Sequence, residues 1–199
     1  FGGAHPTALP EETAKNADVD AAVIGEGEQT ILEIAQGKPF EEIDGLCFQN
    51  DGKIIRTNPR AVLPDLDTLP FPMLEDLLWE KDQKYSFNEM GVSRGCPYLC
   101  TFCASGALWN RKVRMRSPFS IYLEMLFRMQ RYGTTNFQFW DETMTLDKKR
   151  IFDFCDLIMD LGITLSCQTR VDLVTEELLT KMKASGCNAL AMGVESGNQ

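Results

Sequence analysis

The sequence predicts an α/β fold built on parallel strands. From residue 86 onward, four short apolar segments alternate with three amphipathic ones, and polar residues follow each apolar segment. In such an alternation each helix must return the chain to the same edge of the sheet, so the strands run parallel with right-handed crossovers. Strands connected in this way form either a barrel or an open sheet.

The individual elements follow from their start and stop signals. We expect strands over residues 88–93, 136–140, 163–169 and 188–192. Ser117 caps the first helix, with Pro118 at its first position and Gly133 at its end. The second helix, 147–161, has apolar residues at helical spacing and stops at Gly162. Thr175 opens the third helix over 176–185.

Polar residues lie directly after the predicted strands. They comprise three cysteines, Asp141 and Glu142, Arg170 and Asp172, and Glu195 and Ser196. The carboxyl ends of barrel strands converge on one face, where catalytic groups collect. Each residue alone reads as a helix cap or a solvated loop residue, but four successive strands ending in this way favour a site.

The N-terminal part predicts a different unit. Short helical and strand segments at 11–17 and 20–24 lead into Gly25-Glu26-Gly27-Glu28, and a helix over 29–36 ends at Gly37. Strand, glycine turn and helix make one unit of a doubly wound sheet. We therefore interpret residues 1–39 as the C-terminal part of a Rossmann-like domain.

A connector is expected over residues 40–85, before the barrel segment of 86–199. Asn50-Asp51-Gly52 supplies the positive dihedrals of a tight hairpin turn between two short strands. Pro64, Pro70 and Pro72 disfavour helix, so residues 63–73 are predicted to be an extended strap.

The most informative motif is the loop of residues 94–103, here called the cysteine loop, with Cys96, Cys100 and Cys103. Three close thiolates without a fourth Cys or His can hold three irons of a cube and leave one iron open to a small molecule. A structural zinc site wants four ligands, and a disulfide would leave one thiol unpaired. Zinc and unligated thiols remain the alternatives. The other cysteines, Cys47, Cys155, Cys167 and Cys187, are expected in the core.

Composition excludes several classes of protein. The chain has 199 residues, a net charge of −9 and no apolar stretch approaching the ~20 residues of a membrane span. Its acidity argues against broad nucleic-acid binding. The basic stretch 111–116 could face an anionic substrate or cofactor tail, but such a stretch is more often a solvated face. Seven cysteines without a secretory signal fit the reducing cytoplasm.

The cysteine loop resembles the signature of the radical S-adenosylmethionine enzymes, Cys-x-x-x-Cys-x-aromatic-Cys, with Phe102 at the aromatic position. The resemblance implies a partial (β/α) barrel, of which the chain holds four of about six strand-helix units. It also implies a 4Fe-4S cluster on Cys96, Cys100 and Cys103, which binds S-adenosylmethionine and cleaves it reductively to a 5′-deoxyadenosyl radical. An electron donor such as flavodoxin or ferredoxin and a small-molecule substrate go with this chemistry.

The same resemblance implies roles for the residues at the strand ends. Phe102 would pack near the adenine of S-adenosylmethionine. Asp141 or Glu142 would hold the methionine amino group, although Gly-Gly-Glu is the commoner form of this motif. Arg170 would contact the methionine carboxylate, and Glu195 with Ser196 would contact the ribose.

Several further motifs, taken in order, resemble the cobalamin-binding subfamily of these enzymes. They are Gly2-Gly3-Ala-His5-Pro-Thr7, Ile24-Gly25-Glu26-Gly27-Glu28, Leu69-Pro-Phe-Pro72, the cysteine loop and Gly193-Val-Glu-Ser-Gly197. In that subfamily a Rossmann-like domain precedes the barrel and places a corrinoid over the cluster. The implied cobalamin contacts are Gly2, Gly3, His5, Thr7, Gly25, Glu26 and Gly27.

The expected activity is methyl transfer to an unactivated carbon, or its cyclisation or rearrangement. A methylthiotransferase calls for three further cysteines upstream, and only Cys47 precedes Cys96. A non-catalytic iron-sulfur electron-transfer module is the third possibility. Both ends of the chain read as cut, so we expect a fragment of a longer protein, and the isolated fragment to be poorly soluble and without turnover.

Overall fold

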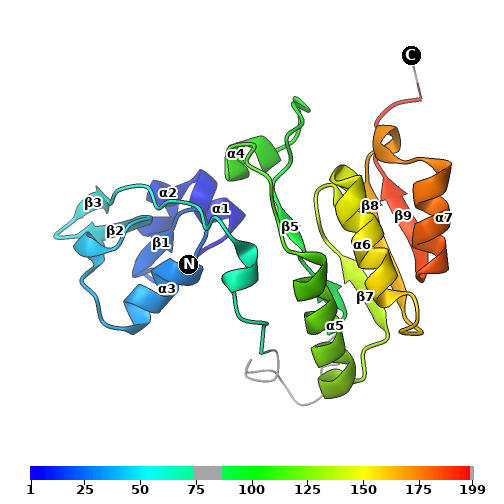
Figure 1. The fold of residues 1–199 in the computed structure, drawn as a ribbon. Helices are drawn as coiled ribbons and strands as arrows, with labels where there is room; N and C mark the ends of the chain where they lie inside the picture. Colours follow the sequence, from blue (N-terminus) through cyan, green and yellow to red (C-terminus); the bar gives the residue numbers. More distant parts are fainter. Residues whose placement is uncertain (74–86, 198–199) are drawn as a thin grey trace. The chain divides into compact units, whose positions relative to one another are not determined.

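The computed structural model describes residues 1–73 and 87–197. The chain divides into two compact units, of which one contains residues 1–64 and 99–110, and the other residues 65–98 and 111–199 (Figure 1). We describe each unit by itself.

The larger unit contains a parallel sheet, as the sequence predicts. Its strands follow one another in the order β4 (Glu89–Met90), β7 (Asn136–Phe139), β8 (Thr164–Thr169) and β9 (Cys187–Met192), and each neighbouring pair is parallel. The crossover helices are α5 (Pro118–Tyr132), α6 (Lys148–Ile158) and α7 (Glu176–Ala184). The alternation of strands and helices is therefore confirmed.

Each crossover helix begins at a side-chain cap. The Ser117 side chain accepts a hydrogen bond from the backbone N–H of Ser120. In the same way, Asp147 accepts from the N–H of Arg150, and Thr175 accepts from the N–H of Leu178. These bonds satisfy backbone donors that have no partner within the helix. Helix α5 ends at Gly133, whose φ of 69° suits the left-handed cap that glycine adopts without strain.

The three helices pack along one face of the sheet (Figure 1), because right-handed crossovers between successive strands return on the same side. Their inward residues meet the buried residues of the strands, including Ile121, Met125, Ile151, Phe154, Leu178, Phe137, Phe139 and Leu165. On β8, buried Leu165, Cys167 and Thr169 alternate with half-buried Ser166 and Gln168.

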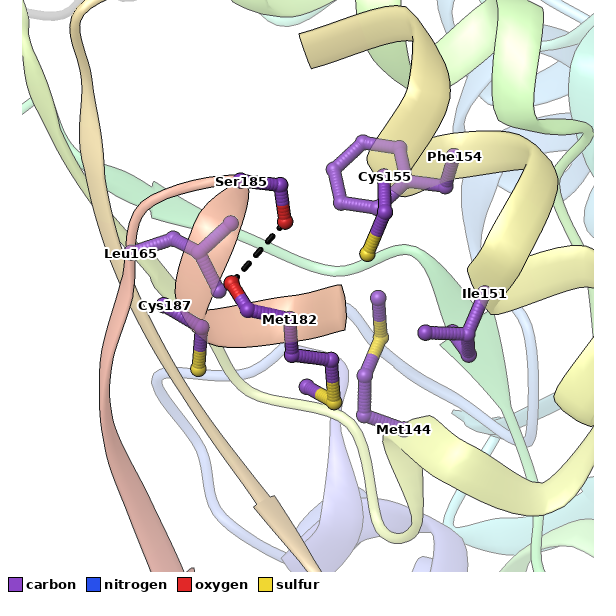
Figure 2. A pocket seen from close by; sticks show the side chains of 8 residues that line it. All are labelled: Met144, Ile151, Phe154, Cys155, Leu165, Met182, Ser185 and Cys187. Atoms are coloured by element: carbon purple, nitrogen blue, oxygen red, sulfur yellow. Dashed lines mark hydrogen bonds between the residues drawn. The ribbon is translucent and has the colours of Figure 1, made fainter. Parts of the chain in front are cut away.

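A small cavity lies in this core (Figure 2). It is lined by Met144, Ile151, Phe154, Cys155, Leu165, Met182, Ser185 and Cys187. Ser185 Oγ donates to the Met182 carbonyl at 2.9 Å, so the hydroxyl at its edge is satisfied. The cavity has no room for a water molecule and does not serve as a ligand site.

The first predicted strand, 88–93, is broken in two. β4 pairs with β7, whereas β5 (Ser93–Arg94) pairs antiparallel with β6 (Arg114–Met115). The amide of Val92, between them, donates to the Asp141 carboxylate instead of a strand carbonyl. The Asp141 side chain thus replaces a backbone partner in the neighbouring strand, and the chain leaves the parallel sheet after β4. Neither β6 nor the short helix α4 (Ser105–Trp109) was predicted from the sequence.

The smaller unit contains an antiparallel sheet in the order β1 (Ala21–Val23), β2 (Leu46–Asn50) and β3 (Lys53–Arg56). Its helices are α1 (Ala4–Ala8), α2 (Pro10–Ala14), α3 (Glu28–Ala35), the 3₁₀ turn η1 (Phe40–Glu42) and α4, which lies in residues 99–110. The hairpin turn is as predicted, with positive φ at Asp51 and Gly52. The hairpin also pairs with β1, so it forms one sheet with the strand that the sequence analysis assigned to the preceding domain.

The strap of residues 63–73 is extended apart from one 3₁₀ turn, η2 (Leu66–Thr68). Asp65 caps this turn by accepting from the Asp67 amide at 2.9 Å. Asp67 in turn accepts from the Ser117 amide at 2.9 Å, which ties the strap to the start of α5. Residues 74–85 of the expected connector lie outside the described residues.

Candidate functional site

The cysteine loop begins directly after β5. Gly95, with φ of 88°, turns the chain there, and Cys96 follows as a half-buried residue. Its sulfur lies 3.7 Å from the hydroxyl of Thr143, a residue just beyond β7. The end of the neighbouring strand therefore contacts the first cysteine of the loop.

The remaining cysteines, Cys100 and Cys103, are exposed and joined locally by a bond from the Cys103 amide to the Cys100 carbonyl at 3.1 Å. Phe102 between them is 71% exposed. Within residues 1–73 and 87–197, no three Cys, His, Asp or Glu side chains come close enough to hold a metal ion. The donor set still fits an iron-sulfur cluster with one open iron, because the three cysteines stand in one short loop and none of them is in a disulfide.

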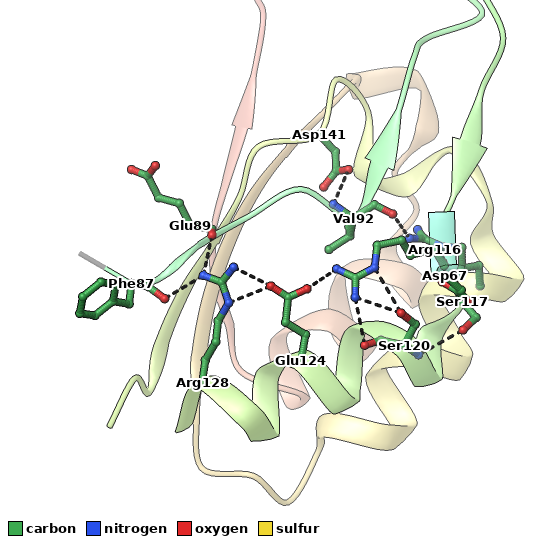
Figure 3. Close-up of polar contacts among 11 residues, drawn as sticks. Asp67, Phe87, Glu89, Val92, Arg116, Ser117, Ser120, Glu124, Arg128 and Asp141 are labelled. Atoms are coloured by element: carbon green, nitrogen blue, oxygen red, sulfur yellow. Dashed lines mark hydrogen bonds and ion pairs between the residues drawn. The ribbon is translucent and has the colours of Figure 1, made fainter. Parts of the chain in front are cut away.

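Asp141, two residues after β7, is completely buried. Figure 3 shows its contact with Val92. Its Oδ1 accepts from the Val92 amide at 3.1 Å and from the Ser93 hydroxyl at 2.5 Å. Its Oδ2 is buried without a hydrogen-bond partner. Asp141 therefore holds the residues that lead into the cysteine loop, and no surface of it is accessible to a ligand.

Burial raises the pKa of Asp141 to about 6, against the opposing effects of the Ser93 hydrogen bond and the positive charge of Arg150. Arg150, on α6, is itself buried and donates to the carbonyls of Arg116 and Val92 at 2.8 and 2.9 Å. The Asp141 carboxyl and the Arg150 guanidinium thus both bind the backbone around Val92.

Glu142 lies next to Asp141 but is only partly buried. At the end of β9, Glu195 is exposed and has a φ of 58°, unusual for a residue other than glycine. The Glu195 carboxylate folds back over Gly193, because a Cβ added there would lie 2.4 Å from Glu195 Oε1. Ser196, also exposed, donates its amide to the Val194 carbonyl at 2.6 Å.

Arg170, at the end of β8, pairs with Asp172 through two hydrogen bonds of 2.9 Å. Its guanidinium carbon also lies 3.8 Å from the centre of the Tyr98 ring, in the cysteine loop. The position of Arg170 and Asp172 at a strand end was predicted from the sequence, but a role for Tyr98 was not. The only available signal was its position between Cys96 and Cys100.

In the smaller unit, the two glycine-containing segments near the N-terminus come together. The Thr7 hydroxyl donates to the Gly3 carbonyl at 2.7 Å and accepts from the Gly25 amide at 3.0 Å. His5 is exposed, with Nε2 3.8 Å from the Glu12 carboxylate. Gly2 is exposed and Gly27 is half-buried. Glu26 accepts from the Leu63 amide at 2.8 Å, so its carboxylate contacts the strap.

The expectation of a solvated basic face over residues 111–116 is wrong at Arg116. This side chain pairs with Glu124, which is 2% exposed and also pairs with Arg128 (Figure 3). Arg128 donates further to the carbonyls of Phe87 and Glu89 at 3.0 and 2.8 Å. We call Glu124, Arg116 and Arg128 the Glu124 network. A charged stretch adjacent to an amphipathic helix gave no sign of this burial.

Of the four cysteines expected in the core, Cys47, Cys155 and Cys167 are buried and Cys187 is half-buried. Burial raises the pKa of the Cys155 thiol, as it does for Cys47. The Cys47 and Cys155 thiols therefore stay protonated and behave as small apolar residues.

Within the described part of the chain, every helix is too short or too polar to cross a membrane.

Known proteins resemble this chain over its whole length. A methyltransferase of Pyrococcus horikoshii named as uncharacterized is 32% identical over 100% of this chain and 45% of its own length. The anaerobic magnesium-protoporphyrin IX monomethyl ester cyclase of Synechocystis is 28% identical over 100% of this chain and 42% of its own. The chain thus spans less than half the length of both relatives.

A solved structure shares the fold. The radical S-adenosylmethionine methyltransferase TsrM from Kitasatospora setae, determined with cobalamin and a [4Fe-4S] cluster bound, superposes with a TM-score of 0.73 at 16% identity. The match covers 97% of this chain and 41% of TsrM.

The family model described as the Radical SAM superfamily matches residues 90–199, which contain the cysteine loop and the parallel sheet. This match, over more than half of the chain, shows that the chain belongs to the radical SAM superfamily, in agreement with the three cysteines of the loop.

Proposed function

We propose that the protein to which this chain belongs is a radical enzyme that cleaves S-adenosylmethionine reductively. The observation that carries the proposal is the cysteine loop, which follows β5 shortly after the first strand of a parallel sheet, in a chain of the radical SAM superfamily. Cys96, Cys100 and Cys103 would hold a 4Fe-4S cluster, which when bound supplies the electron that splits S-adenosylmethionine into methionine and a 5′-deoxyadenosyl radical.

The chain's other residues would bind and orient S-adenosylmethionine. Glu142 is the better candidate than Asp141 for the methionine ammonium, because Asp141 is inaccessible and already holds Val92 and Ser93. Glu195 and Ser196, both exposed at the end of β9, would bind the ribose hydroxyls. Phe102 would cover the adenine, since its exposed ring offers an apolar face.

We further propose that the enzyme uses cobalamin for methyl transfer to, or cyclisation or rearrangement of, an unactivated carbon of a small molecule. Support comes from relatives named as a methyltransferase and as a cyclase, and from the cobalamin bound to TsrM. The cobalamin contacts would lie at Gly2, Gly3, His5, Thr7, Gly25, Glu26 and Gly27. Thr7 bridges two of these segments, which supports a shared binding surface.

In this proposal residues 1–39 belong to a Rossmann-like cobalamin domain, 40–85 to the connector and 86–199 to the barrel. The enzyme would act in the cytoplasm and take its electron from a flavodoxin or ferredoxin. A methylthiotransferase is less favoured, because the relatives described above are named as a methyltransferase and a cyclase, and because Cys47, the one cysteine among residues 1–95, is fully buried in the sheet.

The test uses the full-length protein, reconstituted anaerobically with iron and sulfide. We expect about four irons per chain, an EPR signal of the reduced cluster that changes when S-adenosylmethionine is added, and corrinoid absorbance retained after added cobalamin is removed by gel filtration. A cluster signal that ignores S-adenosylmethionine would identify an electron-transfer module instead. Absence of corrinoid bands alone would remove the cobalamin assignment.

A further inference from the structure

Arg170 and Tyr98 make an unusually close contact at the end of β8. The guanidinium carbon lies 3.8 Å from the centre of the Tyr98 ring, well inside the ~6 Å within which a cation over an aromatic face is attracted to it. Tyr98 stands midway between Cys96 and Cys100 in the sequence. A residue of the sheet thus contacts the segment that separates two of the cysteines.

A second contact fixes the plane of this guanidinium. Nε and Nη2 of Arg170 donate to the two carboxylate oxygens of Asp172, both at 2.9 Å. Asp172 lies two residues after Arg170, within the short turn η5 (Val171–Leu173). The Arg170 hydrogen bond lowers the pKa of the Asp172 carboxyl, so this partner stays ionised at neutral pH. A bidentate carboxylate orients the planar fork, and its flat face is then held on the ring.

We infer that Arg170 is a positioning residue of the cysteine loop, which acts through Tyr98 and is oriented by Asp172. Arg170 restricts the conformations of the backbone on the C-terminal side of Cys96, so that this segment of the loop is ordered before any cluster is present. This role replaces the expected contact of Arg170 with the methionine carboxylate. The functional role of this ordering rests on the proposed function, because it requires a cluster on the loop. The ordering itself can be measured without a cluster.

The experiment measures amide hydrogen exchange of the peptide covering residues 95–101 in the full-length protein without a cluster. Tyr98→Leu and Arg170→Gln should each speed exchange of this peptide about fivefold, the size expected from one cation–π contact. The double variant should exchange no faster than either single variant. Tyr98→Phe keeps the ring and should behave like the unmodified protein. Lys149→Gln, which removes an exposed positive charge on α6, is the matched control and should change nothing.

The strand β7 peptide reports whether each variant is folded, since its exchange should stay constant. The inference would be wrong if the peptide 95–101 exchanged at the unmodified rate in either Tyr98→Leu or Arg170→Gln. It would also be wrong if the double variant exchanged faster than each single variant, by the product of their two factors.

A second measurement separates positioning from ligand binding. After reconstitution, Arg170→Gln and Tyr98→Leu should lower the iron content equally. If Arg170→Gln kept full iron content and native exchange but bound S-adenosylmethionine more weakly, Arg170 would be a ligand contact and the inference would be wrong. If the unmodified protein bound no iron, the proposed function would fail while the exchange data still decided the role of Arg170.

Discussion

Two regions of the larger unit use the same residue types under different degrees of burial. In the Glu124 network on α5, one carboxylate and two guanidinium groups are almost fully buried and satisfy one another and nearby carbonyls. At the strand ends, Arg170 and Asp172 also form a bidentate pair, but their side chains are 36% and 52% exposed. Glu195 nearby is exposed as well.

The difference shows what charged side chains do in each place. A buried carboxylate between two arginines has no accessible face, so it can only hold elements of the fold together. The Glu124 network joins α5 to the carbonyls of Phe87 and Glu89 around β4, and Arg116 lies 5.6 Å from the Phe71 ring of the strap. Partly exposed charges at strand ends keep an accessible face and suit ligand binding or loop positioning.

The largest effect on stability is expected from Glu124→Gln. This change leaves two buried guanidinium groups without their common carboxylate, which costs about 3–5 kcal/mol in the free energy of unfolding. Urea unfolding of the full-length protein, read by hydrogen exchange in α5, measures it. Asp153→Asn removes an exposed carboxylate of α6 that pairs with Lys149 and should leave stability unchanged. If the two variants lowered the free energy of unfolding equally, burial would not decide how much a charged side chain contributes to stability, and the comparison would be wrong.

Asp141 belongs to the buried class although it lies at a strand end. Its folded pKa of about 6 exceeds the ordinary value of 3.8, so the folded state binds this proton more tightly. The stability from the protonated carboxyl is fully present below pH 3.8 and is lost as the pH rises through 6, a decrease of about 3 kcal/mol.

Asp141→Asn should remove that part of the pH dependence, because asparagine keeps an oxygen for Val92 and Ser93 but does not titrate. Urea midpoints measured from pH 4 to pH 7 for both proteins give the comparison. Parallel curves for the variant and the unmodified protein would mean that Asp141 titrates at its ordinary pKa and is solvated.

The smallest effect on stability is expected from Glu195→Gln, which changes an exposed carboxylate. Unfolding should be unaffected, while the dissociation constant of S-adenosylmethionine should rise about tenfold through loss of a charge-assisted hydrogen bond. Isothermal titration on the reconstituted protein measures the affinity, with Glu177→Gln on α7 as the control. An unchanged affinity would remove Glu195 from the proposed site.

Regular elements were predictable from the sequence because their signals are local. Ser117, Gly133 and Thr175 mark helix ends by capping, and the Asn-Asp-Gly turn requires positive φ, so α5, α7 and the hairpin were confirmed. The break between β4 and β5 was not predictable, because it depends on Asp141, 49 residues further along, taking the Val92 amide.

The cysteines of the candidate site were recognisable from spacing, whereas the contacts that hold their loop were not. Tyr98 meets Arg170 only because β8 brings the arginine to the loop. Likewise, the sequence suggested Asp141 and Glu142 as equivalent carboxylates. Burial separates them, since only the tertiary structure places Asp141 under the start of the cysteine loop.

The central claim is that the three thiols of the cysteine loop hold a cluster to which S-adenosylmethionine binds. The most direct measurement is the EPR spectrum of the reduced, reconstituted full-length protein with and without S-adenosylmethionine, compared with Cys100→Ser. We predict a cluster signal that shifts on addition of S-adenosylmethionine in the unmodified protein, and no such signal in Cys100→Ser, which should unfold at the same urea concentration because Cys100 is exposed. A spectrum that S-adenosylmethionine leaves unchanged, or a native spectrum in Cys100→Ser, would contradict the claim.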